Sequence, residues 1–371
     1  MNDFLAWARA IGAGGLGRAY DQPISFPPVL PWTWWLLGSI APGLLSPIPG
    51  DQVALTLIKL PATLADLGMA ALIGWSLRAR PGWAVAGALA ILLVPPTWYV
   101  SALWAQFDSL YVLPMLAAWL LVTRGRPGWG GVAIAIGLMT KPQALPLAIP
   151  FAAYYLRRYG LRGSARAALL AAATVVALWA PFVAAGGPGR YLDTLDAATR
   201  PFAVLSLRAW NPWWIVQDLV SGGQFIRDTT PMFGPITFRW LGAALAGTLE
   251  ALVFLWVWRR PTSTGLAWGL AAATLAAFVG LTTMHERYAY AALVFLLLAW
   301  PDRVAIAAWA LLAVTVSLNL VAAVPPAGHP GSLIPITGPL GIAGSLGMTA
   351  ALVLSLIGLR LRPDPSAHPV V

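Results

Sequence analysis

Residues 264–288 read TGLAWGLAAATLAAFVGLTTMHERY. Residues 264–284 form an apolar run without an ionisable side chain, and His285, Glu286 and Arg287 follow it directly. A helix crosses the hydrocarbon core of a bilayer with roughly 20 residues, so this run is long enough to span it. Comparable runs recur along most of the 371 residues, of which 59% are hydrophobic and only 10% are charged. With a mean hydropathy of +0.75, the composition excludes a soluble globular protein and predicts an all-α polytopic membrane protein.

The positions of the apolar runs predict about eleven membrane-spanning helices in one membrane domain, residues 1–371. The arginines between runs obey the positive-inside rule when the N-terminus lies outside. The predicted spans are 52–77, 84–103, 108–123, 129–139, 142–156, 165–186, 236–257, 264–282, 286–300, 304–323 and 340–359. They give a first outer loop 1–51, a helix bundle 52–186, a long outer loop 187–235, a second bundle 236–360 and a cytoplasmic tail 361–371.

The first outer loop is predicted to carry interfacial helices. Its first helix is amphipathic and too polar to cross a bilayer, with apolar residues at helical spacing at Phe4, Leu5, Trp7, Ala8 and Ile11. The segment 27–46 is more apolar, but a crossing there would place every later arginine turn outside. We therefore expect it to lie in the outer interface, anchored by its tryptophans.

The overall charge does not indicate a nucleic-acid partner. The net charge of +10 follows the predicted membrane topology and is not clustered on a soluble face. The chain has no cysteine, so neither a disulfide nor a thiolate metal site is available. A divalent metal is not favoured, since no D-x-D pair occurs, and Asp193 with Asp196 is the nearest approach.

Three short polar strings end apolar runs on the predicted outer face: residues 104–109, residues 141–143 and residues 285–288. An ionisable group near hydrocarbon is costly, which makes each string a candidate functional site, and we expect them to be parts of one site. The spans on either side of Lys141 rise only roughly 16 and 22 Å, so their junction is expected below the outer surface. Lys141 then points into a pocket that opens outward or, alternatively, snorkels to lipid headgroups.

The long outer loop 187–235 is expected to be ordered and to serve as a lid or to face an acceptor. Trp210 and its neighbours either stack on sugar rings or anchor the loop in the interface. Within the first predicted span, Asp66 needs a partner on a neighbouring helix or in a wet cavity.

Taken together, these strings resemble the GT-C superfamily of polyprenyl-phosphate-sugar-dependent glycosyltransferases, especially bacterial mannosyltransferases related to the second GPI mannosyltransferase. The resemblance covers nearly the whole chain and rests on the order and spacing of the strings. The matching residues are Asn2-Asp3-Phe4 with Trp7, Gly17 and Tyr20, Phe26-Pro27-Pro28, Lys59-Leu60-Pro61 with Asp66, Trp104-Ala105-Gln106-Phe107-Asp108-Ser109, Lys141-Pro142-Gln143, Asn211 and His285-Glu286-Arg287-Tyr288. Relatives usually have one more helix before the first outer loop, so we expect a longer encoded chain or a shortened paralogue.

The resemblance implies a GT-C-like bundle in the cell membrane that transfers a hexose, with mannose favoured, on the extracytoplasmic face with inversion. The donor would be a polyprenyl-phosphate sugar and the acceptor a glycan, lipid or protein, with membrane lipids around the enzyme. Such chemistry needs a carboxylate to accept the acceptor proton and fixed cations for the leaving phosphate. The expected roles are general base for Asp3, donor phosphate binding for Lys141, His285 and Arg287, and substrate binding or support for Gln106, Asp108, Asn211, Trp210 and Asp66.

Other interpretations stay open at this point. Asp3 and Asp108 stand at predicted helix starts, where a carboxylate can simply cap the helix. A polyprenyl-lipid or solute transporter, or flippase, also needs broken helices and charge within the membrane, although the two halves of this chain contain no matching motif. An assembly subunit without activity is the third alternative.

Overall fold

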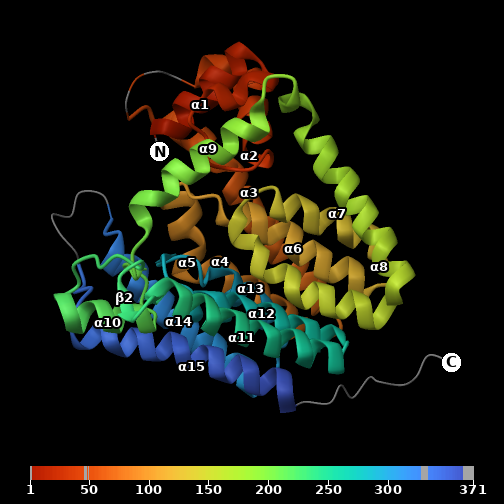
Figure 1. Cartoon of the computed structure of the whole chain (residues 1–371). Coiled ribbons are helices and arrows are strands. Elements are labelled where there is room, and N and C mark those ends of the chain that lie inside the picture. The colour runs from red at the N-terminus through yellow and green to blue at the C-terminus, as the bar shows by residue number, and fades with distance from the viewer. Residues whose placement is uncertain (1, 46–47, 49, 327–332, 362–371) are drawn as a thin grey trace. The chain divides into compact units, whose positions relative to one another are not determined.

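The apolar runs of the sequence form helices in the computed structural model, which describes residues 2–45, 48, 50–326 and 333–361 (Figure 1). The chain divides into two compact units, each assembled from separate stretches of sequence. Unit 1 comprises Met1–Met69, Thr97–Leu145 and Ala165–Pro201, and unit 2 comprises Ala70–Pro96, Pro146–Ser164 and Phe202–Val371. Helices α3 (Gln52–Ser76) and α8 (Leu145–Val183) contribute residues to both units.

Unit 1 begins with two short helices that cross at glycines. Gly12 and Gly38 allow the backbones to approach so closely that a Cβ atom at Gly38 would collide with the Ala8 carbonyl. The two helices are α1 (Asn2–Gly14) and α2 (Val29–Ile40). The other elements of unit 1 are η1 (Leu16–Asp21), η2 (Pro42–Leu44), η3 (Tyr99–Leu103), α6 (Asp108–Thr123), α7 (Pro127–Leu138), η4 (Pro142–Ala144), α9 (Gly187–Thr199) and η5 (Arg200–Phe202).

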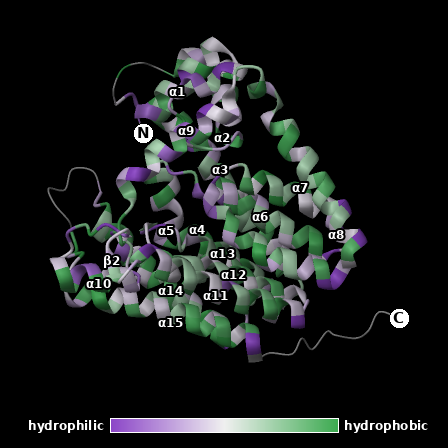
Figure 2. Ribbon diagram, viewed as in Figure 1, coloured by the Kyte–Doolittle hydropathy of each residue, from purple (hydrophilic) through white to green (hydrophobic). Residues whose placement is uncertain are grey.

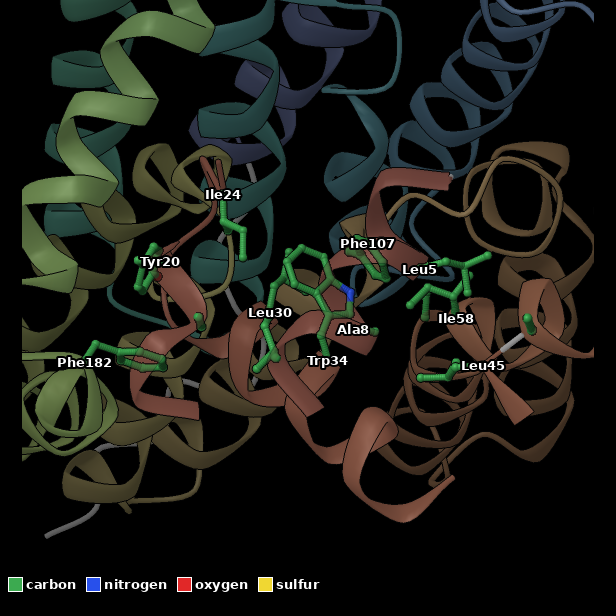
Figure 3. Packing of buried hydrophobic residues seen from close by; sticks show 14 residues of the cluster. Leu5, Ala8, Tyr20, Ile24, Leu30, Trp34, Leu45, Ile58, Phe107 and Phe182 are labelled. Atoms are coloured by element: carbon green, nitrogen blue, oxygen red, sulfur yellow. The ribbon is translucent and has the colours of Figure 1, made fainter. Parts of the chain in front are cut away.

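The core of unit 1 surrounds Trp34, which has no exposed surface and lies among Leu30, Ala8 and Phe107 in Figure 3. The predicted amphipathic face of the first helix is confirmed, because Leu5, Ala8 and Ile11 are the buried residues of α1. Helix α2 has only 12 residues, too few to cross a bilayer, which agrees with the interfacial interpretation of 27–46.

Unit 2 is built around α12 (Ser263–Gly280), whose residues from Leu266 to Gly280 are all buried. This helix packs against α11 (Phe238–Arg259), α13 (Tyr290–Leu297) and α15 (Pro339–Leu361), and α14 (Arg303–Ala323) packs against α13 and α15. The remaining elements are α4 (Pro81–Leu93), β1 (Ser206–Leu207), α10 (Pro212–Ser221), β2 (Pro231–Phe233), β3 (Ile236–Thr237) and β4 (Met284–His285). The short helix α5 (Pro95–Trp98) is divided between the units after Pro96.

In the described residues, six helices are long and apolar enough to cross a membrane, or seven if the bent pair Pro81–Leu93 and Pro95–Leu103 forms one span. In Figure 2 the long helices of unit 2 are mostly green, for hydrophobic, with purple at helix ends. The expected eleven spans are not confirmed. Helices α6, α7 and α13 have 16, 12 and 8 residues and are too short, and the predicted spans 142–156 and 165–186 correspond to the two arms of α8, which breaks at Gly160.

The long loop 187–235 is ordered, as predicted. It contains α9, β1, α10 and β2, and its two halves belong to different units, divided between Pro201 and Phe202. In unit 2, β1 pairs in parallel with β4, so the loop forms a ladder with the string that begins at His285. Strands β2 and β3 form a small antiparallel hairpin directly before α11.

Candidate functional site

The string 104–109 is placed by a strained turn in unit 1. The chain leaves the π-helical turn η3 and adopts a φ of 60° at Ala105, a left-handed conformation that is uncommon for a residue with a Cβ atom. Asp108 then starts α6, where the positive end of the helix dipole stabilises its carboxylate. Strain of this kind persists only where the surroundings enforce it, and it is concentrated at functional sites.

Lys141 forms a buried ion pair with Asp108. The ammonium Nζ lies 2.8 Å from Asp108 Oδ1, and the two side chains are 3% and 0% exposed. Lys141 has an extended backbone between α7 and η4, with Pro142 after it, so the predicted break in the helix is confirmed. Its burial does not agree with snorkelling to headgroups. The ion pair is compatible with a supporting role for Asp108.

Asp66 shares this polar centre through Ser109, the residue next to Asp108. Its carboxylate accepts hydrogen bonds from Ser101 and Ser109, and all three side chains are buried. The expected partners on neighbouring helical segments are therefore present, although they are hydroxyls. We call Asp66, Ser101, Asp108, Ser109 and Lys141 the unit 1 centre.

Two further predicted positions of unit 1 lie close to this centre in the chain. Gln106 is half-buried, two residues before Asp108. Gln143, two residues after Lys141, has a buried Oε1 without a hydrogen-bond partner among the described residues. An acceptor atom left in this state costs about 1–3 kcal/mol, so it is a candidate for contact with a ligand hydroxyl.

Asp3 lies in the exposed first turn of α1. Its neighbour Phe4 contacts Phe107, the residue before Asp108, with the ring centroids 5.0 Å apart. The aromatic contact thus ties the segment that carries the predicted base to the string 104–109.

In unit 2, His285 lies on a second strained backbone. Thr283 has a φ of 64° and Arg208 a φ of 62°, and the backbone of Arg208 pairs with that of His285. Ala105, Thr283 and Arg208 are the non-glycine residues with a positive φ in the described part of the chain. Ala105 lies in the string 104–109, Thr283 lies two residues before the string 285–288, and Arg208 pairs with His285. Arg208 is exposed and donates from Nη1 to the Ala323 carbonyl at 3.3 Å.

The side chains of the string 285–287 form a charged cluster. Glu286 Oε1 accepts from Arg287 Nη1 at 2.7 Å, and His285 Nδ1 lies 3.8 Å from Glu286 Oε2. Burial by itself would raise the pKa of the Glu286 carboxyl, but the interactions with His285 and Arg287 outweigh that cost and lower the pKa to about 2. The Arg287 guanidinium also lies over the Tyr288 ring, 5.3 Å from its centroid.

Exposure separates the histidine and the arginine of this cluster. The side chain of His285 is 23% exposed, whereas that of Arg287 is 10% exposed. We call Arg208, His285, Glu286 and Arg287 the unit 2 centre. Arg208 was not singled out from the sequence, because its position depends on a backbone pairing between segments almost eighty residues apart.

A carboxylate that the sequence did not single out holds the loop against this centre. Asp228 is 1% exposed and accepts from Arg239 Nε and Nη2 at 3.0 and 2.8 Å. It also accepts from the hydroxyls of Thr282 and Thr283 at 3.0 and 3.3 Å. The short spacing between Asp228 and Arg239, across the hairpin turn at Gly234, was the available signal in the sequence.

Trp210 and Asn211 are structural in this arrangement. Trp210 has no exposed surface, and its Nε1 donates to the Ile336 carbonyl at 3.0 Å, so no ring face is open to a sugar. Asn211 caps α10 by accepting from the Trp214 amide and donates to the Phe278 carbonyl, each at 3.0 Å. Of their predicted roles, support of the loop fits the structure and direct stacking does not.

The expectation that all the strings share one site stays a prediction, because Asp3, Gln106, Asp108, Lys141 and Asp66 belong to unit 1 and His285, Arg287, Trp210 and Asn211 to unit 2. Within the described ranges, no group of three or more His, Asp or Glu residues could hold a metal ion. No protein-family model matches the chain, and no curated protein matches it either.

Proposed function

We propose that this protein is a membrane glycosyltransferase of the GT-C type, which moves a hexose, with mannose favoured, from a polyprenyl-phosphate sugar to an acceptor hydroxyl. The observation that carries the proposal is the unit 2 centre, where an exposed arginine and a partly exposed histidine adjoin a buried Arg287–Glu286 pair at the end of an apolar helix. The finer topology, with about eleven crossings and the site on the extracytoplasmic face of the cell membrane, belongs to the same proposal.

In the proposed reaction, the acceptor oxygen attacks the anomeric carbon of the donor sugar. The bond between that carbon and the phosphate oxygen breaks, and its electron pair leaves with the polyprenyl phosphate. Asp3 accepts the acceptor proton as general base, and one displacement inverts the anomeric configuration. Fixed cations are needed at the phosphate, since negative charge develops there as the bond breaks.

Burial divides the predicted phosphate-binding residues into two groups. Arg208 and His285 are accessible and are the residues we assign to direct phosphate contact. Arg287 and Lys141 are buried in ion pairs, so we assign them to positioning and to the local field. Arg208 is thereby added to the residues expected from the sequence.

An apolar groove in unit 2 gives a hydrocarbon chain a place next to Arg208. Its volume is about 480 Å³, and its walls come from the second half of α14 and the end of α4. The lining residues are Ala90, Leu93, Val94, Pro95, Trp309, Ala313, Val314, Ser317 and Leu318. Asn319, the next residue of α14, donates to the Arg208 carbonyl at 2.8 Å. On this proposal the polyprenyl chain lies in the groove and its phosphate lies toward Arg208, because ligand sites combine apolar walls with a few polar groups.

The test is sugar transfer by the purified chain in proteoliposomes that contain a radiolabelled polyprenyl-phosphate hexose. We expect labelled product from the wild type and a loss of about 10²–10⁴-fold in rate for Asp3→Asn, which removes the base. Asp193→Asn is the matched control, because Asp193 is also an exposed carboxylate on a unit 1 helix. Transfer that Asp3→Asn leaves intact would contradict the assignment of the base, and movement of the lipid across the bilayer without transfer would favour a transporter.

A further inference from the structure

A cavity lined by arginines lies at the end of α11 that is remote from His285. Its volume is about 290 Å³, and its described lining residues are Trp256, Arg259, Arg260, Leu359 and Arg360. Helix α11 starts beside Arg239 and the Asp228 carboxylate, and its 22 residues rise about 33 Å to Arg259. That length matches the hydrocarbon core of a bilayer, so the cavity and the unit 2 centre belong to opposite membrane surfaces.

Among its described lining residues, the cavity gathers positive charge without a compensating acid. Three guanidinium groups contribute to its lining, and none of the described lining residues is Asp or Glu. Arginines at helix ends are common on the cytoplasmic side of membrane proteins, where they determine topology. Topology alone can explain Arg259 and Arg360, because both are exposed. Arg260 differs, because its Nη1 is buried and has no hydrogen-bond partner among the described residues.

A buried hydrogen-bond donor without an acceptor destabilises the folded protein, and the cost is larger when the donor belongs to a cationic group. An anion with several acceptor oxygens would satisfy Arg260 Nη1 and offset the mutual repulsion of the three arginines. Guanidinium groups match phosphate oxygens in geometry and form paired hydrogen bonds with them. The polar part of the cavity therefore fits a phosphate group.

The other walls of the cavity are apolar. Leu359 is buried and Trp256 is half-buried, and both belong to helices that can span the membrane. A ligand that fits has a phosphate at the membrane surface and hydrocarbon beside it. Basic pockets between membrane helices on the cytoplasmic side bind the headgroups of anionic lipids, which are enriched in that leaflet.

We infer that this cavity binds the headgroup of an anionic phospholipid of the cytoplasmic leaflet, with Arg260 donating to the phosphate and Arg259 and Arg360 neutralising it. The site is separate from the proposed transferase site, and its place in the cytoplasmic leaflet rests on the membrane topology proposed above. Its occupant joins the ends of α11 and α15, two helices that both pack against α12.

The experiment is native mass spectrometry of the purified full chain in detergent, titrated with phosphatidylglycerol or with phosphatidylcholine of the same acyl chains. We expect the wild type to retain phosphatidylglycerol in preference, and Arg260→Gln to weaken its binding about fivefold, the effect of one cation near an anionic lipid. Arg260→Lys should fall between the two. Arg303→Gln is the matched control, because Arg303 is an exposed arginine at a helix end that does not line the cavity.

Equal binding of the two lipids by the wild type would overturn the inference without any variant. An equal loss of binding in Arg303→Gln and Arg260→Gln would also overturn it, because it would assign the effect to overall charge. Inorganic phosphate that displaces phosphatidylglycerol at similar concentration would assign the cavity to a soluble phosphate compound. The elution volume of each variant in size-exclusion chromatography confirms that the compared proteins are folded.

Discussion

The two polar centres use the same kinds of side chain in different surroundings. In the unit 1 centre, Lys141 and Asp108 are 3% and 0% exposed, and the hydroxyls around Asp66 are buried with them. In the unit 2 centre, His285 is 23% exposed and Arg208 is exposed, although the pair beneath them is buried. The difference indicates that the first centre fixes the fold of its unit, whereas the second can contact a ligand.

The largest effect is expected from breaking the ion pair of the unit 1 centre. Lys141→Met leaves the Asp108 carboxylate buried without its cation, which costs about 3–5 kcal/mol of stability. The midpoint of thermal unfolding in detergent measures the loss. The double variant Lys141→Met with Asp108→Leu removes both charges and should regain most of it. Equal destabilisation of the single and double variants would show that the pair does not determine the stability.

The next effect concerns the proposed sugar transfer and the unit 2 centre. Arg208→Gln and His285→Ala should each lower kcat/KM for sugar transfer by about 10²–10³-fold, as expected when one donor to a developing negative charge is removed. Their unfolding midpoints should stay near that of the wild type, since both side chains reach the surface. Arg227→Gln, another exposed arginine of the same loop, is the control. An equal loss of activity in Arg227→Gln would contradict the assignment of ligand contact to the unit 2 centre.

The buried part of the unit 2 centre should be visible in the pH dependence of stability. The pKa of Glu286 is about 2, below its ordinary value of 4.5. The contribution of Glu286 to the free energy of unfolding is therefore complete above pH 4.5 and is lost as the pH falls through 2. That contribution is on the order of 3 kcal/mol. Unfolding midpoints measured across this range should fall steeply for the wild type and less for Glu286→Gln. Parallel curves for the two proteins would contradict the assignment.

The sequence predicted the local features of both centres better than their surroundings. The break at Lys141 and the face of α1 follow from short-range spacing and from the cost of charge in hydrocarbon. The partners of Lys141 and Asp66, by contrast, lie 33 to 43 positions away in the sequence and depend on how the helices pack. The expected eleven spans are not confirmed, because hydropathy does not distinguish a helix buried in protein from one that crosses lipid.

The smallest effect is expected at Trp210, where a substitution distinguishes a structural role from a sugar-binding role. Trp210→Phe removes the hydrogen bond to the Ile336 carbonyl and should cost about 1 kcal/mol of stability. The KM for the sugar donor should not change, because the indole is fully buried. A higher KM with unchanged stability would restore the stacking hypothesis and weaken the contrast between the two centres.

The Asp228 carboxylate also determines how this part of the molecule opens. Its four donors come from Arg239, Thr282 and Thr283, so no one segment can leave without breaking bonds made by the others. Segments joined in this way exchange their amide hydrogens as a cooperative unit. The ladder between Leu207 and His285 should therefore exchange at one common rate, and a ligand that protects one strand will protect its neighbour as well.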